Sequence, residues 1–249
     1  MNESMITLVT GANKGIGRQI AAQLGALGHI VVIGARDAEL GRKAAAELRE
    51  SGTDAASVVL DVTDPVSAAA AATEIDSRYG RLDALVNNAG ISGPPSSDPG
   101  DQRPSTADLD VLRAIFETNY FGVIAVTNAM LPLLRRSTAP RIVNVSSSVG
   151  SLSINAGLVR AADSPIPNSA GYVPSKSALT ALTLQYARDL VPDGIKVNAV
   201  CPGYVATDLN GHRGHRTPAE GAVAAVRMAT IGADGPTGTF TDDEGPAPW

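Results

Sequence analysis

The strongest constraint on the fold is the order of elements near the start of the chain. An apolar run at 5–9 leads into a glycine turn at 10–17, and a second apolar run follows at 30–33. Between the turn and the second run, apolar residues recur at helical spacing up to Gly28, a residue type that commonly ends helices. Strand, glycine turn, helix and strand form a βαβ unit, so we predict an α/β fold with a parallel sheet.

The glycine turn carries Gly11, Gly15 and Gly17 in the spacing GxxxGxG. At the first turn of a βαβ unit, glycines bring backbone N–H groups and a helix N-terminus against a pyrophosphate. A glycine-rich turn that binds no ligand is the alternative, because a glycine motif alone is a weak signal. We predict dinucleotide contacts from the turn residues Gly11, Asn13, Lys14, Gly15, Ile16 and Gly17.

The end of the second predicted strand indicates which dinucleotide binds. NAD-binding folds of this kind place an acid about 20 residues after the glycines, where it holds the ribose 2′-OH. Here Ala35 occupies that position, Arg36 follows it, and Lys14 lies in the glycine turn. Two cations and no acid in that position suit a 2′-phosphate, so we predict NADP(H) rather than NAD(H). Asp37 is an acid close by, but its position before 38–40 fits a helix N-cap better than a ribose ligand.

The rest of the chain continues the alternation of strands and helices. Its 249 residues, 44% of them hydrophobic, fit one globular domain over residues 1–249 with a Rossmann-type, doubly wound parallel sheet of about seven strands. Further strands are predicted at 57–60, 82–86, 141–148, 195–200 and 238–241, and helices at 38–50, 64–79, through 116–120, 172–190 and 218–229. Loops at 91–104, 148–171 and 208–217 all follow strand C-termini, so they should converge over one end of the sheet.

Tyr172 and Lys176 lie four residues apart where the predicted helix at 172–190 begins. Residues at this spacing share a helix face, with Cβ atoms about 5–6 Å apart. A neighbouring ammonium favours the phenolate, so we expect the pKa of Tyr172 to fall below its usual value of about 10. Such a phenol is a usable general acid or base, although a pair at this spacing also occurs by chance on surface helices.

Five motifs follow one another in an order that resembles the short-chain dehydrogenase/reductase family, in its short, carbonyl-reductase-like branch. They are TGxxxGIG at 10–17, NNAG at 87–90, Asn119, Ser147 and the pair Tyr172 and Lys176. The resemblance implies that Tyr172 donates a proton to the substrate oxygen, while Lys176 lowers the tyrosine pKa and binds the nicotinamide ribose. It also implies that Ser147, between its neighbours Ser146 and Ser148, orients that oxygen, and that Asn119 holds a relay water.

The resemblance implies further cofactor contacts. Asp61 and Val62 would lie beside the adenine, and Val205 and Thr207 would hold the nicotinamide carboxamide. The full set that it adds to the glycine turn and Arg36 is Asp61, Val62, Asn88, Ala89, Gly90, Tyr172, Lys176, Pro202, Gly203, Val205 and Thr207. We therefore predict an NADPH-dependent oxidoreductase that reversibly reduces a ketone or aldehyde to an alcohol through a Ser-Tyr-Lys-Asn tetrad.

Two other functions fit parts of the pattern. A non-catalytic NADPH-binding regulator would need the glycine turn, but not Tyr172 and Ser147 together. A sugar-nucleotide epimerase or dehydratase of the same family usually has the glycine spacing GxxGxxG, which differs from the spacing here. The residues do not name the carbonyl substrate, since ketones, aldehydes, quinones and steroids all suit the same tetrad.

The segment 148–171 begins beside Ser147 and is longer than the corresponding segment in the plain form of the family. It contains Pro165 and Pro167, and we expect it to wall the substrate site or to cover a subunit contact. Family members are commonly oligomers built on the helices that carry Asn119 and Tyr172. We therefore expect a homo-oligomer, or a monomer if this segment blocks that surface.

Charge and composition limit the classes of partner that the protein can bind and the cellular location that we expect for it. A net charge of −5 without a basic block argues against a nucleic-acid partner, and no apolar run reaches transmembrane length. The acidic start lacks the basic region of a signal peptide, so we expect a cytoplasmic protein. Cys201 is the single cysteine, which excludes an intrachain disulfide, and we expect it to be buried and inert.

The histidines do not indicate a metal site. His212 and His215 lie three residues apart but have no carboxylate or cysteine at ligand spacing, so we interpret them as part of a solvated loop. His29 is expected in a turn. We predict that the chemistry needs no metal.

Overall fold

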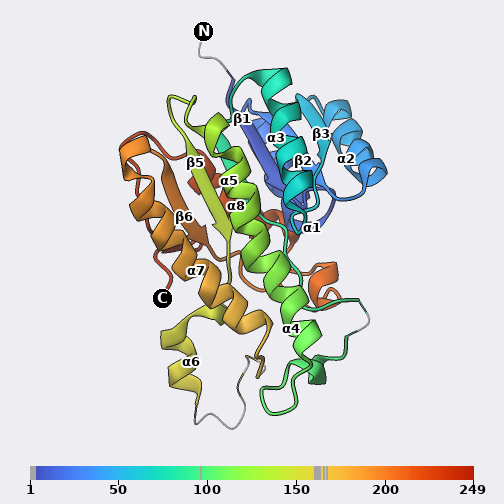
Figure 1. Ribbon diagram of the computed structural model, residues 1–249, viewed down its shortest axis with the longest axis vertical. Coiled ribbons are helices and arrows are strands. Elements are labelled where there is room, and N and C mark those ends of the chain that lie inside the picture. Colours follow the sequence, from blue (N-terminus) through green and yellow to red (C-terminus); the bar gives the residue numbers. More distant parts are fainter. Residues whose placement is uncertain (1–3, 96, 160–163, 165, 167) are drawn as a thin grey trace.

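The computed structural model describes residues 4–95, 97–159, 164, 166 and 168–249 (Figure 1). Pro165, Pro167 and the first three residues, on which the signal-peptide prediction partly rests, lie outside the described residues. In the described part, seven parallel strands form one sheet in the order β3-β2-β1-β4-β5-β6-β7. Their bounds are β1 Ile6–Thr10, β2 Ile30–Ala35, β3 Ala55–Val59, β4 Ala84–Asn87, β5 Arg141–Val145, β6 Lys196–Val200 and β7 Phe240–Thr241.

The central strand β1 is buried along its whole length, as expected for a parallel strand that is covered on both faces. It pairs with β2 and β4, and Leu8 lies opposite both Val32 and Leu85. The order of strands along the sheet reverses between β1 and β4. Open α/β sheets bind ligands outside the carboxyl ends of the strands at this kind of switch point. The glycine turn follows β1, and the NNAG motif begins at the last residue of β4 and continues beyond it, so both motifs lie at the switch point.

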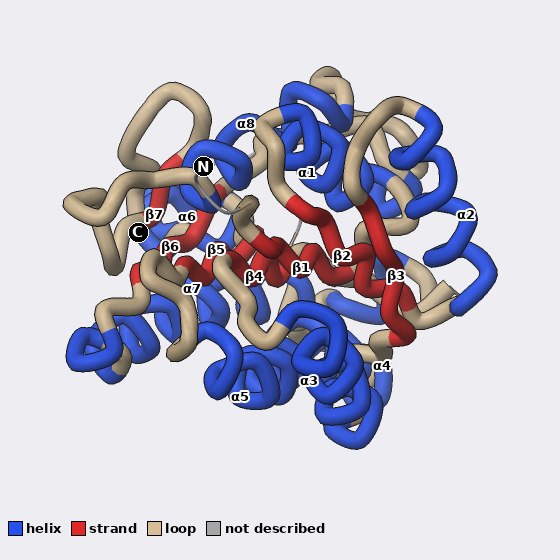
Figure 2. The backbone as a smooth tube through the Cα atoms, turned by 90° about the horizontal axis from the view of Figure 1, so that it is seen from above, coloured by secondary structure: helices blue, strands red, loops and turns tan. Residues whose placement is uncertain are grey.

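Helices cover both faces of the sheet (Figure 2). One face carries α1, α2 and α8, and the other carries α3, α5 and α7, each with its own apolar core. The helices are α1 Gly15–Ala26, α2 Ala38–Glu50, α3 Pro65–Tyr79, α4 Leu109–Phe116, α5 Gly122–Leu134, α6 Leu152–Leu158, α7 Tyr172–Asp189 and α8 Pro218–Ala229. Asp37 caps α2 by accepting a 3.0 Å hydrogen bond from the Leu40 N–H. The predicted doubly wound α/β fold is thus confirmed.

The predicted helix through 116–120 is not continuous. It consists of α4 and α5, joined by a π-helical segment, η2 (Glu117–Phe121). At Gly122, where α5 begins, a Cβ atom would lie 2.9 Å from the Val62 carbonyl oxygen, so the close approach requires glycine. Single π-helical turns of this kind are frequent at functional sites.

The predicted loop at 148–171 begins with helical structure instead. A 3₁₀ turn, η3 (Ser148–Gly150), is followed by α6. Ser151 caps α6, because its Oγ accepts a 3.2 Å hydrogen bond from the Ile154 N–H. Our sequence-based prediction missed this helix because α6 buries none of its residues and so has no apolar periodicity.

The other two predicted loops converge at the same end of the sheet, towards which the strand arrows point in Figure 1. The first contains a 3₁₀ turn, η1 (Pro99–Gln102), and the second contains η5 (Asp208–Asn210); a further short turn, η4 (Val191–Asp193), follows α7. Ser92 Oγ donates a 2.9 Å hydrogen bond to the Leu209 carbonyl, which joins the two loops directly. None of the helices in the described part of the chain is long and apolar enough to cross a membrane.

His29 lies in the short connection that turns the chain from α1 into β2, where its N–H donates a 3.2 Å hydrogen bond to the Leu24 carbonyl, and it is buried. Its Nδ1 lies 2.8 Å from Thr7 Oγ1. Burial lowers the pKa of His29, and Arg141 lowers it further while Asp83 opposes the shift. Cys201 is buried and free, as expected.

Candidate active site

The glycine turn and the NNAG motif form one structural unit. Thr10 Oγ1 accepts hydrogen bonds from the Asn88 and Ala89 N–H groups at 3.0 and 2.9 Å. The Asn88 side chain in turn donates to the Thr10 carbonyl at 2.9 Å. At Gly17, a Cβ atom would lie 2.4 Å from Asn88 Nδ2, so a larger residue has no room there. The Asn88 side chain therefore packs against Gly17 and is hydrogen-bonded to Thr10, so it holds the glycine turn in place.

The residues around this turn fit a dinucleotide. Gly11 and Gly15 have φ values of +63° and +58°, in the region where glycine carries little cost. The N-terminus of α1 has no side-chain cap at Lys14, so the N–H groups of its first turn are not covered by a capping side chain. These groups and the positive end of the helix dipole suit a pyrophosphate. Thr207 is close by, since its Cγ2 lies 3.6 Å from where a Cβ on Gly15 would be.

The two cations predicted to hold a 2′-phosphate have different surroundings. Arg36 is exposed at the end of β2 and has no acidic partner among the described residues. Lys14 instead forms a 2.6 Å ion pair with Asp208. This bond is the main reason why the pKa of the Asp208 carboxyl is lowered. Of the two cations, Arg36 is therefore the one available to bind a phosphate, whereas the ion pair of Lys14 with Asp208 links the glycine turn to η5.

The remaining predicted cofactor residues lie along the same carboxyl edge of the sheet. Asp61 follows β3, and its Oδ1 accepts hydrogen bonds from the Thr63 N–H and hydroxyl at 3.0 and 2.7 Å. Gly90 follows β4, and a Cβ there would lie 3.5 Å from Lys176 Nζ. The other residues of the predicted set on this edge are Val62 after β3, Ala89 after β4, and Pro202, Gly203, Val205 and Thr207 after β6.

The three serines after β5 have distinct environments. Ser147 Oγ accepts a 3.4 Å hydrogen bond from the Val149 N–H, and the Ser147 side chain also interacts with Tyr172, which opposes the rise of the tyrosine pKa. Ser146 is buried, with its Oγ 2.8 Å from Thr180 Oγ1 and 3.1 Å from the Lys176 carbonyl. Ser148 contributes its backbone N–H, which donates to Cys201 Sγ at 3.2 Å. Of the three, Ser147 is the serine whose side chain interacts with Tyr172.

Lys176 is buried one turn after Tyr172 on α7. Its Nζ donates a 2.9 Å hydrogen bond to the Val145 carbonyl at the end of β5. The same atom lies 5.7 Å from the centroid of the Tyr172 ring. Burial lowers the pKa of Lys176 to about 8.

The expected lowering of the Tyr172 pKa is wrong for the protein alone. Tyr172 is half-buried, and burial raises the pKa of its hydroxyl to about 12. The hydrogen bond with Ser147 opposes this shift without cancelling it. Desolvation disfavours the charged form of both groups, and Lys176 directs its ammonium to Val145 rather than to the phenol oxygen.

Asn119 lies in the π-helical segment and is fully buried. Its Oδ1 accepts from the Ile91 N–H at 2.9 Å, and its Nδ2 donates to the Ile91 carbonyl at 2.9 Å and to Ser175 Oγ at 3.0 Å. Both amide protons are therefore used within the protein. A relay water can be bound only through the remaining acceptor sites of Asn119, so the structure restricts the predicted role.

A family model described as short chain dehydrogenase matches residues 5–217. The chain belongs to the short-chain dehydrogenase family. The match spans the glycine turn, the NNAG motif, Asn119, Ser147, Tyr172 and Lys176, which the fold brings to one edge of the sheet. The family is one of oxidoreductases, and the chain has its Rossmann-type fold.

Known relatives of this short-chain dehydrogenase include reductases of small molecules. Short-chain dehydrogenase/reductase 1 of Saponaria officinalis is 37% identical, with 94% of this chain and 92% of that protein covered. Carbonyl reductase (NADPH) 1 of Rattus norvegicus is 34% identical, with 98% of each chain covered. The solved structure of salutaridine reductase from Papaver somniferum has a TM-score of 0.81 and 32% identity, over 96% of this chain and 99% of that one.

Several residues that hold the site of this short-chain dehydrogenase in place were not found from the sequence. Gln102 accepts from the Tyr172 N–H, and Ser175 accepts from Asn119. The main-chain oxygen of Trp249 accepts from Ser151 Oγ, Ser153 Oγ and the Ser153 N–H, at 2.7 to 3.0 Å. These bonds join segments far apart in the sequence, and no local pattern marks them.

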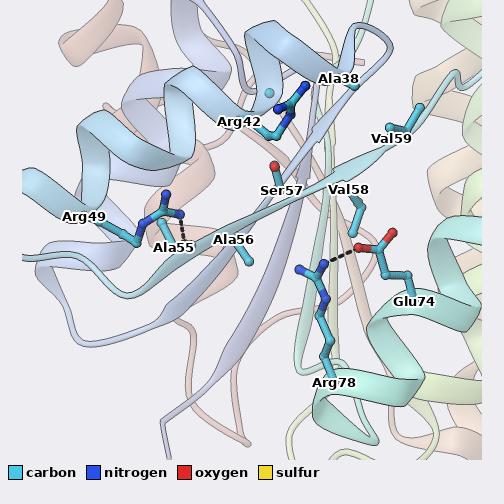
Figure 3. Close-up of a pocket in the computed structure, with 11 residues that line it drawn as sticks. Ala38, Arg42, Arg49, Ala55, Ala56, Ser57, Val58, Val59, Glu74 and Arg78 are labelled. Atoms are coloured by element: carbon cyan, nitrogen blue, oxygen red, sulfur yellow. Dashed lines mark hydrogen bonds and ion pairs between the residues drawn. The ribbon is translucent and has the colours of Figure 1, made fainter.

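A hollow of about 350 Å³ lies away from these residues, at the edge of the sheet formed by β3 (Figure 3). Arg49 on α2 donates to the Ala55 carbonyl there, and Arg78 pairs with Glu74 on α3. Its polar groups are thus largely satisfied by their neighbours.

The two histidines of the loop at 208–217 have separate partners. His212 pairs with Asp208 at 2.9 Å, and His215 packs against Tyr204.

Proposed function

We propose that this short-chain dehydrogenase reduces a ketone or aldehyde to an alcohol with NADPH. The observation that carries the proposal is the arrangement of Ser147, Tyr172 and buried Lys176. Ser147 follows β5 and interacts with the Tyr172 side chain, Lys176 lies one helical turn after Tyr172, and all three lie at the same sheet edge as the glycine turn. NADPH, when bound along this edge, would supply the hydride for the carbonyl carbon.

Tyr172 is the proposed proton donor. Because its pKa is raised to about 12, the phenol is neutral at pH 7 and has a proton to give to the substrate oxygen. Ser147 is the proposed second donor to that oxygen. Hydrogen bonds aimed at an oxygen that gains negative charge stabilise the transition state more than the ground state. Lys176, held by the Val145 carbonyl, is proposed to bind the nicotinamide ribose.

Three observations support NADP(H) as the cofactor. Arg36 is exposed and without an acidic partner among the described residues, at the position after β2 where a ribose 2′-phosphate would lie. Asp37 caps α2 through its Oδ1, the role that its position in the sequence predicted in place of a ribose ligand. The rat relative is named as a carbonyl reductase that uses NADPH.

The decisive variant is Tyr172→Phe, which removes the proposed proton donor and keeps the ring. We expect it to bind NADPH with unchanged affinity and to lose nearly all turnover. The assay follows NADPH consumption with 4-nitrobenzaldehyde, a ketone, a quinone and a keto-steroid, with NADH as the control cofactor. Reduction of any of these carbonyls by Tyr172→Phe at the wild-type rate would show that the proposed mechanism is wrong.

The remaining parts of the proposal concern partners. The substrate is proposed to be a small carbonyl compound or alcohol, in keeping with the reductases among the relatives. Whether the chain forms a homo-oligomer or is kept monomeric by the segment at 148–171 stays a prediction, which light scattering of the purified protein would test.

A further inference from the structure

The helix that carries the proposed proton donor begins without a side-chain cap of its own. Tyr172 is the first residue of α7, and the preceding Gly171 has no side chain to accept from the first N–H groups of the helix. A helix N-terminus leaves four N–H groups without partners inside the helix. A Cβ at Gly171 would lie within 2.8 Å of both Ile115 Cδ1 and Gln102 Oε1, so neighbouring segments close over this position.

Gln102 supplies the missing acceptor from a segment 70 residues upstream. Its Oε1 accepts from the Tyr172 N–H at 2.9 Å and from Ser169 Oγ at 2.7 Å. Its Nε2 donates to the Ser92 carbonyl at 2.6 Å, and its own carbonyl accepts from the Ala170 N–H at 2.8 Å. One residue of η1 thus joins the segment after β4 to the start of α7.

Two branches of hydrogen bonds hold the backbone of Tyr172. The branch that starts at its N–H runs through the Gln102 side chain to the Ser92 carbonyl. On its carbonyl side, Ser175 Oγ donates to the Tyr172 carbonyl at 2.7 Å and accepts from Asn119, which is bonded to Ile91. The two branches meet at the neighbouring residues Ile91 and Ser92. The first turn of α7 is therefore fixed from both sides to the same short segment after β4.

We propose that Gln102 is a positioning residue for the proton donor Tyr172, an inference that rests on the proposed function of Tyr172. A helix can fray or rotate in its first turn, and a rotation there moves the phenol hydroxyl relative to Ser147. Gln102 holds that turn through the Tyr172 N–H and leaves the glycine turn untouched. Loss of this hold affects proton donation and not the binding of NADPH.

The first test compares Gln102→Ala with Arg103→Ala. Arg103 is the next residue, exposed, and its side chain has no partner among the described residues, which makes it a matched control. We expect Gln102→Ala to lower kcat for 4-nitrobenzaldehyde, or for whichever carbonyl of the panel the wild type reduces, by about 10- to 100-fold, the usual effect of a small misplacement. The KM for NADPH should stay within about twofold, and Arg103→Ala should behave as the wild type.

The second test uses Gln102→Glu, which preserves the shape of the side chain. A protonated glutamic acid has one donor and one acceptor, as Gln102 needs for Ser92 and Tyr172, whereas the carboxylate has no donor for the Ser92 carbonyl. We expect the ratio of its kcat to that of the wild type to rise as the pH falls towards the ordinary glutamate pKa of about 4.3. A side chain whose bonds to Ser92 and Tyr172 do not affect turnover would give a ratio that does not depend on pH.

A third measurement does not need turnover. Hydrogen–deuterium exchange of the peptide that contains the Tyr172 amide should be faster in Gln102→Ala than in the wild type and in Arg103→Ala. Equal kcat in the two alanine variants would overturn the inference, as would equal exchange or a parallel loss of NADPH binding and kcat. If Tyr172→Phe turns over normally, or no carbonyl is reduced, the proposed function fails instead, and exchange still decides whether Gln102 holds the helix.

Discussion

Ser146, Ser147 and Ser148 follow one another, yet each does something different. The Ser147 side chain interacts with Tyr172 and opposes the rise of its pKa, the Ser146 hydroxyl is buried against Thr180, and the Ser148 backbone N–H donates to Cys201. Successive side chains after a strand point in different directions, so a shift of one residue exchanges a hydroxyl in the site for one in the core. At the scale of single residues, position within a few ångströms decides function.

Arg36→Asp tests the cofactor preference at this scale. The substitution removes the exposed cation after β2 and puts an acid where a 2′-phosphate would lie. We expect the Kd for NADPH to rise about 10- to 100-fold, in line with the loss of charge-assisted hydrogen bonds, while the Kd for NADH falls or stays constant. Fluorescence titration with both cofactors measures this. Arg113→Asp on α4 repeats the charge change elsewhere, and unchanged NADPH affinity in Arg36→Asp would contradict the assignment.

Gly17→Ala tests the contact between the two motifs. The added Cβ would lie 2.4 Å from Asn88 Nδ2 and 2.7 Å from the Gly11 carbonyl oxygen, so Asn88 must leave the Thr10 carbonyl. We expect a loss of about 1–3 kcal/mol in the free energy of unfolding, typical of overpacking, together with weaker NADPH binding. Urea denaturation provides the measurement. Gly232→Ala, where the added Cβ meets no atom within 4 Å, should leave both quantities unchanged.

At the scale of elements, α6 depends on a segment that is distant in the sequence. The Ser151 and Ser153 hydroxyls and the Ser153 N–H all donate to the main-chain oxygen of Trp249. The Trp249 ring packs against Phe240 of β7, with ring centroids 5.9 Å apart. Because α6 follows Ser147 closely and buries none of its own residues, this anchor largely sets its position beside the site.

Trp249→Ala should therefore loosen α6 without affecting the glycine turn. If the segment at 148–171 walls the substrate site, we expect the KM for 4-nitrobenzaldehyde to rise several-fold while the KM for NADPH stays constant. Steady-state kinetics with each substrate varied in turn separates the two constants. Trp249→Phe keeps a ring against Phe240 and should retain the wild-type KM. An unchanged carbonyl KM in both variants would remove α6 from the substrate site.

At the scale of the whole molecule, buried polar groups connect the layers beneath the site. Asn87 Nδ2 donates to Asn144 Oδ1 at 2.9 Å and to Thr127 Oγ1 at 3.1 Å, and Asn144 Nδ2 donates to Thr183 Oγ1 at 2.9 Å. This chain joins β4 and β5 to α5 and α7. A satisfied buried network rigidifies its surroundings, so the scaffold under Tyr172 and Ser147 is held by polar bonds as well as by apolar packing.

The pH dependence of stability tests the buried His29. Burial lowers its pKa from 6.5, so the folded protein keeps the imidazole neutral while the unfolded chain takes up a proton. Stability from this group is present above pH 6.5 and is lost as the pH falls towards the lowered pKa. We expect His29→Gln to flatten the fall in unfolding free energy between about pH 7 and pH 5, as measured by urea denaturation. The exposed His215→Gln should keep the wild-type slope, and a wild-type slope in His29→Gln would contradict the assignment.

The sequence alone determined the features that depend on near neighbours. The glycine turn after β1, the cap at Asp37, most strands and the spacing of Tyr172 and Lys176 follow from local periodicity and from residue types with restricted backbone or capping roles. These features sufficed to predict a doubly wound sheet with a dinucleotide turn at its carboxyl edge, whereas most of the other site residues were predicted from the family resemblance.

Only the tertiary structure decided how those residues are tuned and held. The pKa of Tyr172 is raised rather than lowered because desolvation depends on everything that surrounds the hydroxyl, and helical spacing to Lys176 says nothing of that. Gln102 reaches Tyr172 across 70 residues, and Trp249 reaches Ser151 across 98. Hydrogen bonds over such separations exist only after the sheet has brought its loops together, so no pattern within one segment could reveal them.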